Sequence, residues 1–427
     1  MTRETYTKKT GSTKEVSLLA NKSIIRTEEK ETYAELLTDK SAFKTFLTEQ
    51  INAYPELFPD TIHQGFRLFG FVPKSVKQEL RLRRIQTIAD NQVWQIKPSF
   101  VMPYMTMDTD TAQKILFLSR WAPNWALSQV FEKDGMTIER LKTHIGRYSL
   151  VGTTVKDADS IPKDVAADEK HAWISGEKVY IATTVAEGCY LGASISPSAD
   201  EEDLTTSYDQ FKQEAQQVQP TYQPNTVNTD GFKSTMNAWK NIFPFITIIQ
   251  CFFHAVLNIK KSTTKVTMEL YQQIREKVWH VYHGNTKRFF SQRLRRLQEW
   301  AEILEDSPLK IKLIKLCAKK DWFTITYNFP SCYRTSNMID RLLDTMDRWL
   351  FAKKWFHGKI TSAEKGVRAF CLIHNFRPSC PTTVKKHYGQ ASPFERLNGF
   401  TYHHCWLQNM LIATSKQDIY IFQQKKL

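Results

Sequence analysis

The feature that most constrains the fold is an alternation of strand and helix patterns between residues 165 and 251. Three runs rich in β-branched and aromatic residues come first, separated by the turn signals Ser175-Gly176 and Glu187-Gly188. A helical segment that begins with four consecutive acids follows, and acids are favourable at a helix N-terminus. A fourth strand, a helix and a fifth strand complete the order β-β-β-α-β-α-β. The predicted strands span residues 165–173, 178–185, 189–195, 225–230 and 245–251, and the two helices end near residues 217 and 241.

Two carboxylates occupy defined places in this order. Asp168 lies inside the first strand, and Asp230 lies at the end of the fourth. The order of elements with these acids is typical of the RNase H-like fold, a mixed sheet in which the two strands are neighbours. In-line displacement at a phosphodiester uses two hard cations about 4 Å apart, and carboxylates on rigid strands can hold such a pair. Taken alone, Asp168 could be a charge on an edge strand, and Asp230 could belong to an ordinary Asp-Gly turn.

The stretch from residue 227 to 254 resembles Mutator-like insertion-sequence transposases of the DDE type. In that family an Asp-Gly opens a helix, a Phe-Pro closes it, and a Cys-x-x-His follows the next strand. The corresponding residues here are Asp230-Gly231, Phe243-Pro244, and Cys251 with His254. The resemblance covers about residues 165 to 360. We interpret Cys251 and His254 as structural residues near the site, with a zinc site as the less favoured alternative.

The resemblance also implies a third acid, on a helix that follows an all-helical insertion. The family pattern Thr-Thr-Asn-x-x-Glu corresponds to the run from Thr335 to Asp340. The carried-over acid is therefore Asp340, one methylene shorter than the usual Glu. Asp344 and Asp347 lie on roughly the same helix face and are alternative ligands.

From the resemblance we expect an enzyme, a DNA transposase that cleaves element ends and transfers strands into target DNA. The catalytic and metal-binding residues would be Asp168, Asp230 and Asp340, with two Mg²⁺ ions as cofactors and Mn²⁺ as a substitute. The expected partners are double-stranded DNA, comprising terminal repeats and target, and further copies of the chain in a homodimer or larger assembly. The alternatives are a transposase-derived DNA-binding protein that no longer cuts, and an RNase H-like nuclease without strand transfer.

The expected architecture is an α/β chain whose RNase H-like core carries a helical insertion and follows a helical DNA-binding region. The predicted regions are a mobile arm at 1–35, a helical DNA-binding region at 36–150, a catalytic core at 160–254 and 335–360, a helical insertion at 255–334, and a basic aromatic C-terminal region at 361–427. Within 36–150, residues 111–145 resemble a helix-turn-helix, and a basic stretch at 81–84 is predicted as helical. The candidate DNA-binding residues are Arg140, Lys142, Lys287, Arg288, Arg293, Arg295 and Arg296, and the alternative for each is a solvated basic helix face.

Charge is distributed unevenly along the 427 residues, which carry a net charge of +15. Residues 151–250 contain 7 basic and 14 acidic side chains, a net of −7, whereas residues 251–427 contain 30 and 13, a net of +17. A carboxylate-rich centre beside a strongly basic segment suits a polyanion-binding protein. The seven scattered cysteines and the interrupted apolar windows predict neither a disulfide framework nor a membrane span. We expect a cytoplasmic, nucleoid-associated protein.

Overall fold

The computed structural model describes residues 22–27, 29–72, 80–103, 105 and 107–416. The chain divides into two compact units. Unit 1 is built from the described residues up to Ile161, from Gln217–Gln219 and from those that begin at Ala352. Unit 2 comprises Pro162–Gln216 and Pro220–Phe351. Both are mixed α/β, so the predicted α/β class is confirmed at that level.

Unit 2 is organised around a five-stranded mixed sheet. Its strands are β5 (Asp164–Ile174), β6 (Glu177–Ala186), β7 (Cys189–Ser196), β8 (Thr226–Thr229) and β9 (Thr247–Gln250), in the spatial order β7-β6-β5-β8-β9. The first three strands pair antiparallel, and β5, β8 and β9 pair parallel. The two hairpins turn through Ser175-Gly176 and Glu187-Gly188, all with positive φ, the conformation that matches the twist of paired strands. All five predicted strands are present.

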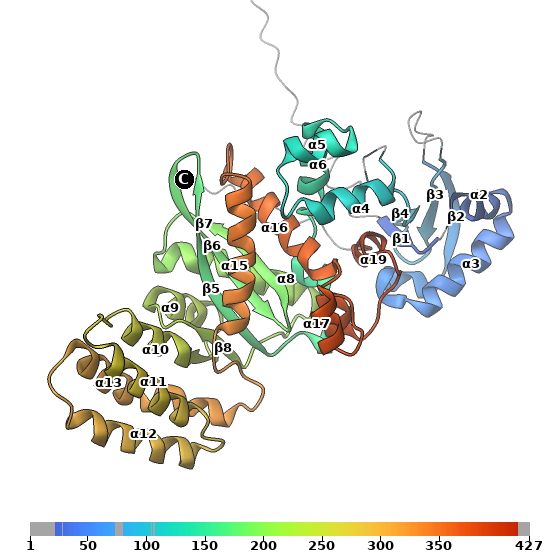
Figure 1. Ribbon diagram of the computed structural model, residues 1–427. Helices are drawn as coiled ribbons and strands as arrows, with labels where there is room; N and C mark the ends of the chain where they lie inside the picture. The colour runs from blue at the N-terminus through green and yellow to red at the C-terminus, as the bar shows by residue number, and fades with distance from the viewer. Residues whose placement is uncertain (1–21, 28, 73–79, 104, 106, 417–427) are drawn as a thin grey trace, which may run out of the picture. The chain divides into compact units, whose positions relative to one another are not determined.

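Helices cover both faces of this sheet (Figure 1). One face packs against α8 (Glu201–Val218) and α9 (Lys233–Ile242), where the rings of Phe211 and Trp239 lie 5.9 Å apart in the core. The other face packs against α15 (Asn337–Ala352), held by a hydrogen bond of 2.6 Å from the Tyr190 hydroxyl to the carbonyl of Leu342. Residues 352–360, predicted to be part of the core, belong to unit 1 instead.

Residues 252–328 form a helical subdomain within unit 2, as predicted for 255–334. Apolar residues at helical spacing on each element converge on one core that includes Phe252, Phe290 and Phe323. The exposed faces of the same helices carry the basic residues. The elements are α10 (Phe252–Lys260), α11 (Met268–Tyr282), α12 (Lys287–Glu302), α13 (Pro308–Ala318), α14 (Lys320–Thr324) and η4 (Ile325–Asn328).

The N-terminal part of unit 1 contains a sheet, where the sequence analysis expected helices. The strands β1 (Lys22–Ile25), β2 (Phe66–Phe71), β3 (Arg83–Thr87) and β4 (Val93–Pro98) pair in the order β1-β4-β3-β2. The basic stretch predicted as helical therefore runs into strand β3. Arg and Leu favour helices in isolation, but pairing of β3 with both β2 and β4 outweighs that preference.

Four helices lie in the chain between strands β1 and β2 of this sheet. They are α2 (Lys30–Thr38), α3 (Lys40–Ala53), η1 (Pro55–Leu57) and η2 (Asp60–Gln64). The predicted mobile arm at 1–35 is wrong for its described part, because β1 is buried and α2 begins at residue 30. Its first 21 residues lie outside the described residues.

The predicted helix-turn-helix segment does consist of helices. They are α4 (Thr109–Leu118), α5 (Asn124–Phe131) and α6 (Gly135–Ile145), followed by α7 (Leu150–Thr154) and η3 (Ala158–Ser160). Asp108 caps α4 by accepting from the backbone N–H of Thr111 at 2.6 Å, and Asp134 caps α6 in the same way.

The C-terminal residues belong to unit 1 and do not form a region of their own. Their helices are α16 (Ile360–Phe376), α17 (Pro381–Lys386), α18 (Pro393–Asn398) and α19 (Trp406–Ala413). Helix α16 is almost entirely buried, and the buried Arg368 guanidinium donates to the carbonyls of Gly146 and Tyr148 at 3.3 and 2.8 Å. In the predicted basic aromatic region, Phe370, Phe376, Phe394 and Tyr402 are therefore core residues, whereas Tyr388 and Phe400 are exposed. No helix in the described parts of either unit has the length and apolarity needed to cross a membrane.

Candidate active site

Asp168 and Glu169 point to opposite faces of the unit 2 sheet, because side chains alternate along strand β5. Lys170, two residues after Asp168, forms an ion pair of 2.8 Å with Asp347 of α15. Asp168 therefore faces α15. Burial, together with the charges of Glu169, Asp230 and Asp340, raises the pKa of Asp168 to about 7. Asp230 and Asp340 thus lie close enough for their charges to act on Asp168.

Asp230 follows β8, the parallel neighbour of β5, and its side chain is exposed. Its Oδ1 accepts a hydrogen bond of 2.7 Å from the backbone N–H of Phe232. Gly231 has a φ of +96°, a conformation that favours glycine, so the chain turns sharply between β8 and α9. Asp230 is therefore both the first residue of an Asp-Gly turn and an exposed carboxylate beside β5.

Asp340 lies in the first turn of α15. The hydroxyl of Ser336 donates to Asp340 Oδ2 at 2.8 Å and lies 3.1 Å from Nδ1 of His254. The segment before α15 is fixed to the ends of two strands, since Asn228 donates to the carbonyl of Tyr333 and the N–H of Phe252 donates to that of Arg334. These contacts position the third carboxylate near the ends of β8 and β9.

Cys251 and His254 belong to the same hydrogen-bonded cluster as Ser336. Cys251 caps α10, and its sulfur accepts from the backbone N–H groups of His254 and Ser336 at 3.4 and 3.1 Å. Hydrogen bonding with Cys251, together with the charges of Cys251, Asp340 and Asp230, raises the pKa of His254 to about 9 in spite of its burial. Burial alone would raise the pKa of Cys251, but hydrogen bonds with His254 and Ser336 lower it overall. Both residues therefore lie beside Ser336, whose hydroxyl donates to Asp340.

The two alternative acids on α15 make other contacts. Asp347 pairs with Lys170, as described above, and Asp344 pairs with Arg348 at 2.5 Å on the exposed surface of the helix. Of the three acids on α15, Asp340 is the one whose charge acts on Asp168.

Glu169 is the site residue that sequence reasoning left without a role. Its Oε1 accepts hydrogen bonds from the Tyr208 hydroxyl at 2.6 Å and from Thr235 Oγ1 at 2.7 Å. Burial raises the pKa of Glu169. The partners come from α8 and α9, so Glu169 ties β5 to both helices. The signal in the sequence was the strand alternation, which directs adjacent acids to opposite faces.

The predicted DNA-binding residues of α12 are mostly exposed. Lys287, Arg288 and Arg296 are open to solvent. The other two make contacts within the unit: Arg295 pairs with Glu299 at 3.2 Å, and Arg293 donates to the carbonyl of His280 at 2.7 Å. The basic face of α12 is thus carried chiefly by three side chains.

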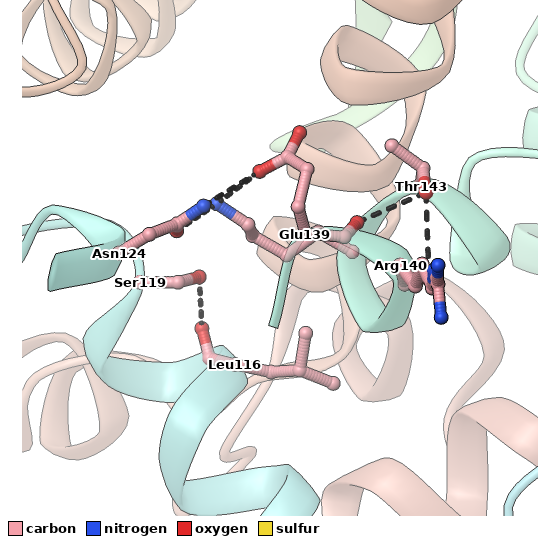
Figure 2. Close-up of polar contacts among 7 residues, drawn as sticks. Leu116, Ser119, Asn124, Glu139, Arg140 and Thr143 are labelled. Carbon is pink, nitrogen blue, oxygen red and sulfur yellow. Dashed lines mark hydrogen bonds and ion pairs between the residues drawn. The ribbon is translucent and has the colours of Figure 1, made fainter. Parts of the chain in front are cut away.

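The two predicted DNA-binding residues of α6 differ from each other. Arg140 is exposed, whereas the Lys142 side chain is 14% exposed and donates to Asn124 at 2.6 Å. Lys142 also pairs with Glu139 at 3.0 Å. Figure 2 shows Asn124 and Glu139 joined by a hydrogen bond of 2.9 Å, which links α5 to α6. Lys142 therefore has a structural role, because its side chain contacts both α5 and α6.

No protein-family model matches this chain, and no curated protein matches it either. In the part of the chain that the structure describes, no three His, Cys, Asp or Glu side chains are grouped so that they could hold a metal ion. After burial, the charges of Glu169, Asp230 and Asp340 nevertheless contribute to the raised pKa of Asp168. The chemistry of this donor set, three carboxylates that repel one another at neutral pH, fits a hard divalent cation.

Proposed function

We propose that unit 2 is an RNase H-like catalytic domain and that the protein is a DNA transposase of the DDE type. The observation that carries the proposal is that Asp168 on β5 feels the charges of Asp230, directly after the adjacent parallel strand β8, and of Asp340 on α15. The strand order β7-β6-β5-β8-β9 supports the same assignment, as does the helical subdomain between the second and third acids.

The three carboxylates are the residues that would hold metal. Asp168, Asp230 and Asp340 would hold two Mg²⁺ ions, with Mn²⁺ as a substitute. When bound, such ions activate the attacking oxygen and stabilise the leaving oxygen in phosphodiester displacement. Burial is the largest cause of the raised pKa of Asp168, and the charges of neighbouring acids add to it. A bound cation would offset this like-charge contribution, which supports the assignment.

The remaining residues of the site would position the acids. Ser336 holds the Asp340 carboxylate in one orientation, and Cys251 and His254 hold Ser336. Glu169 fixes the strand that carries Asp168 through Tyr208. A water molecule and then a DNA 3′-hydroxyl would be the nucleophiles.

The proposed partners are double-stranded DNA at element ends and target, and a second copy of the chain or more. The exposed Lys287, Arg288 and Arg296 on α12 support DNA binding within unit 2, since phosphate contacts require cations free to approach the backbone. A nucleoid-associated location in the cytoplasm would follow from that activity.

The proposal is tested by Mg²⁺-dependent cleavage and joining of DNA that carries the sequences flanking this gene. We expect the native protein to cut and join, and Asp168→Ala, Asp230→Ala and Asp340→Ala to bind DNA but lose at least about a thousandfold in rate. A second variant of the third acid, Asp340→Asn, is compared with the matched control Asp344→Asn, because both replace a carboxylate on α15 by an amide.

Each other result selects a different function. Cleavage without joining would identify a nuclease, and binding without cleavage in Mg²⁺ or Mn²⁺ would identify a DNA-binding protein derived from a transposase. If Asp344→Asn abolished activity and Asp340→Asn did not, the assignment of the third acid would be wrong.

A further inference from the structure

Unit 1 contains a pocket of about 520 Å³, a volume within the usual range of small-molecule sites. Every residue that lines it belongs to unit 1, whereas the proposed catalytic carboxylates belong to unit 2. Two acidic and two basic side chains contribute to the lining: Glu56, Asp60, Lys156 and Lys416. The way in which these four charges pair indicates which ligand the pocket suits.

One acid and one base of the pocket pair with each other. The Lys416 Nζ lies 2.9 Å from Asp60 Oδ1. Lys156 and Glu56 form no such pair, and among the described residues no acid makes an ion pair with Lys156. The pocket therefore keeps one cation and one anion that do not neutralise each other by direct contact.

The Lys156 side chain is held in place by backbone carbonyls. Its Nζ donates to the carbonyl of Gly152 in α7 at 2.8 Å and to that of Ala413, the last residue of α19, at 2.6 Å. An ammonium carries three N–H donors, and the third has no acceptor among the described residues. Burial lowers the pKa of Lys156 to about 7, although the charge of Glu56 acts in the opposite direction. The charged form is thus short of an acceptor and of a counter-charge.

Glu56 is held in a comparable way. Its Oε1 accepts a hydrogen bond of 2.6 Å from the hydroxyl of Tyr402, whose ring is buried. No donor within the described ranges reaches the other oxygen, Oε2. Because the charge of Glu56 acts on Lys156, the two groups lie near each other in the same pocket.

Buried apolar side chains form another part of the lining. They are Pro59, Trp94 and Val155. The indole of Trp94 offers a flat apolar surface to which a ring or an aliphatic chain can pack. Small-molecule sites commonly combine such a wall with a few polar groups that fix the orientation of the ligand.

We propose that this pocket binds an α-amino acid with an apolar side chain, whose carboxylate accepts from Lys156 and whose ammonium donates to Glu56. A ligand that carries both charges bridges two groups that do not reach each other. A carboxylate alone would leave Glu56 unpaired and repelled, and an amine alone would do the same to Lys156. The inference depends on unit 1 alone and stands apart from the catalytic proposal.

The test is calorimetric titration of the full chain with matched ligands, in EDTA and without DNA. Phenylalanine carries both charges, phenylpropionate lacks the ammonium, and phenethylamine lacks the carboxylate. We expect phenylalanine to bind and each of the other two to bind at least about tenfold more weakly, because each leaves one charged group of the pocket unpaired. Glycine, which keeps both charges but has no side chain to pack on Trp94, should also bind more weakly.

Glu56→Gln tests the anionic side of the pocket. The amide keeps an acceptor for the Tyr402 hydroxyl but removes the charge. We expect about tenfold weaker binding of phenylalanine and no loss of phenylpropionate binding. Glu49→Gln, which removes an exposed carboxylate from α3 outside the pocket, is the matched control and should bind both ligands as the native protein does.

Lys156 is tested in the native protein, because its replacement would also remove the two contacts with backbone carbonyls. A bound carboxylate raises the pKa of Lys156 from about 7, so binding at about pH 8 should take up close to one proton. The uptake should fall towards zero at about pH 5.5, where Lys156 is already charged in the unliganded protein. Titrations in two buffers of different ionisation enthalpy measure it.

Three results would overturn the proposal. The first is an absence of phenylalanine binding at concentrations up to about 10 mM. The second is equal binding of phenylalanine and phenethylamine, or of phenylalanine and phenylpropionate, which would show that the pocket does not read both charges. The third is unchanged phenylalanine binding in Glu56→Gln. DNA cleavage measured separately bears on the catalytic proposal and not on this one.

Discussion

At the scale of single residues, Asp168 occupies a position where an ionised carboxylate is unfavourable unless a cation lies nearby. It is partly buried on strand β5, and three other acids act on it. Burial and like charges both disfavour the ionised form. Sites with such perturbed acids are often functional, because an enzyme tolerates the cost where chemistry requires the group.

The raised pKa of Asp168 predicts a pH dependence of stability. Its pKa rises from 3.8 to about 7 on folding, so between these values the unfolded chain releases a proton that the folded chain keeps. The free energy of unfolding should therefore fall as pH rises through this window. Asp168→Asn removes the effect, and the variant should be the more stable protein by a few kcal/mol at pH 7.5 in EDTA, with the difference vanishing near pH 4.

Urea unfolding followed across this pH range measures the difference. Asp344→Asn, which removes a carboxylate from the exposed face of α15, is the control and should follow the native profile. Parallel profiles for the native protein and Asp168→Asn would contradict the raised pKa. Because Mg²⁺ would bind the ionised carboxylates, its addition should raise the stability of the native protein and not that of Asp168→Asn.

At the scale of elements, helix α12 has a buried apolar face and exposed basic residues outside that face. Phe290, Leu294 and Leu297 are buried in the core of the helical subdomain. Arg288 and Arg296 lie on the face opposite this core, and Lys287 is exposed at the start of the helix. The helical period that stabilises the subdomain therefore leaves these three cations in solvent.

Replacement of these three residues on α12 by alanine should weaken DNA binding in a salt-dependent way. Each lost phosphate contact on a duplex reduces the slope of log affinity against log salt by about 0.9, so we expect a total change of roughly 2.7. Stability should change little, because all three side chains are exposed. Fluorescence anisotropy over a salt series measures the slope. Replacement of Lys310, Lys312 and Lys315 on α13 is the control, and an equal effect there would show that α12 has no special role.

At the scale of the whole molecule, the two units differ in how the chain builds them. Unit 2 is drawn almost entirely from one continuous stretch of sequence, whereas unit 1 joins both ends of the chain. Ile24 of β1 donates its N–H to the Ser415 hydroxyl at 2.9 Å, a contact between residues 391 positions apart. Unit 1 therefore cannot form until both its N-terminal and its C-terminal segments are present.

This difference predicts how fragments behave. A fragment of residues 162–351 should fold alone and unfold cooperatively, because it contains its own sheet and helical cores. A fragment of residues 1–161 should not fold alone, because α16 and its buried Arg368 would be missing. Co-expression with residues 352–427 should restore it. Heat-induced unfolding measured by circular dichroism distinguishes these cases, and a cooperative transition for 1–161 alone would contradict the prediction.

The sequence by itself determined the sheet of unit 2 and the helical subdomain. Strand alternation, turn glycines and helical periodicity are local signals, and in these regions neighbours in sequence are also neighbours in space. The places of Asp168 and Asp230 follow from the same signals, since an acid within a strand and an acid at the end of its parallel neighbour must approach each other. The clustering of Cys251 with His254 is local for the same reason.

Tertiary structure alone decided the rest. Arg83 and its neighbours are paired strand residues because β2 and β4 lie beside them, which local propensity cannot indicate. Asp340, Asp344 and Asp347 share one helix, and only the packing of α15 on the sheet separates the acid near Asp168 from the other two. The N-terminal and C-terminal segments of unit 1 likewise pack together through contacts between residues that are far apart in the sequence, and local sequence patterns do not indicate such contacts.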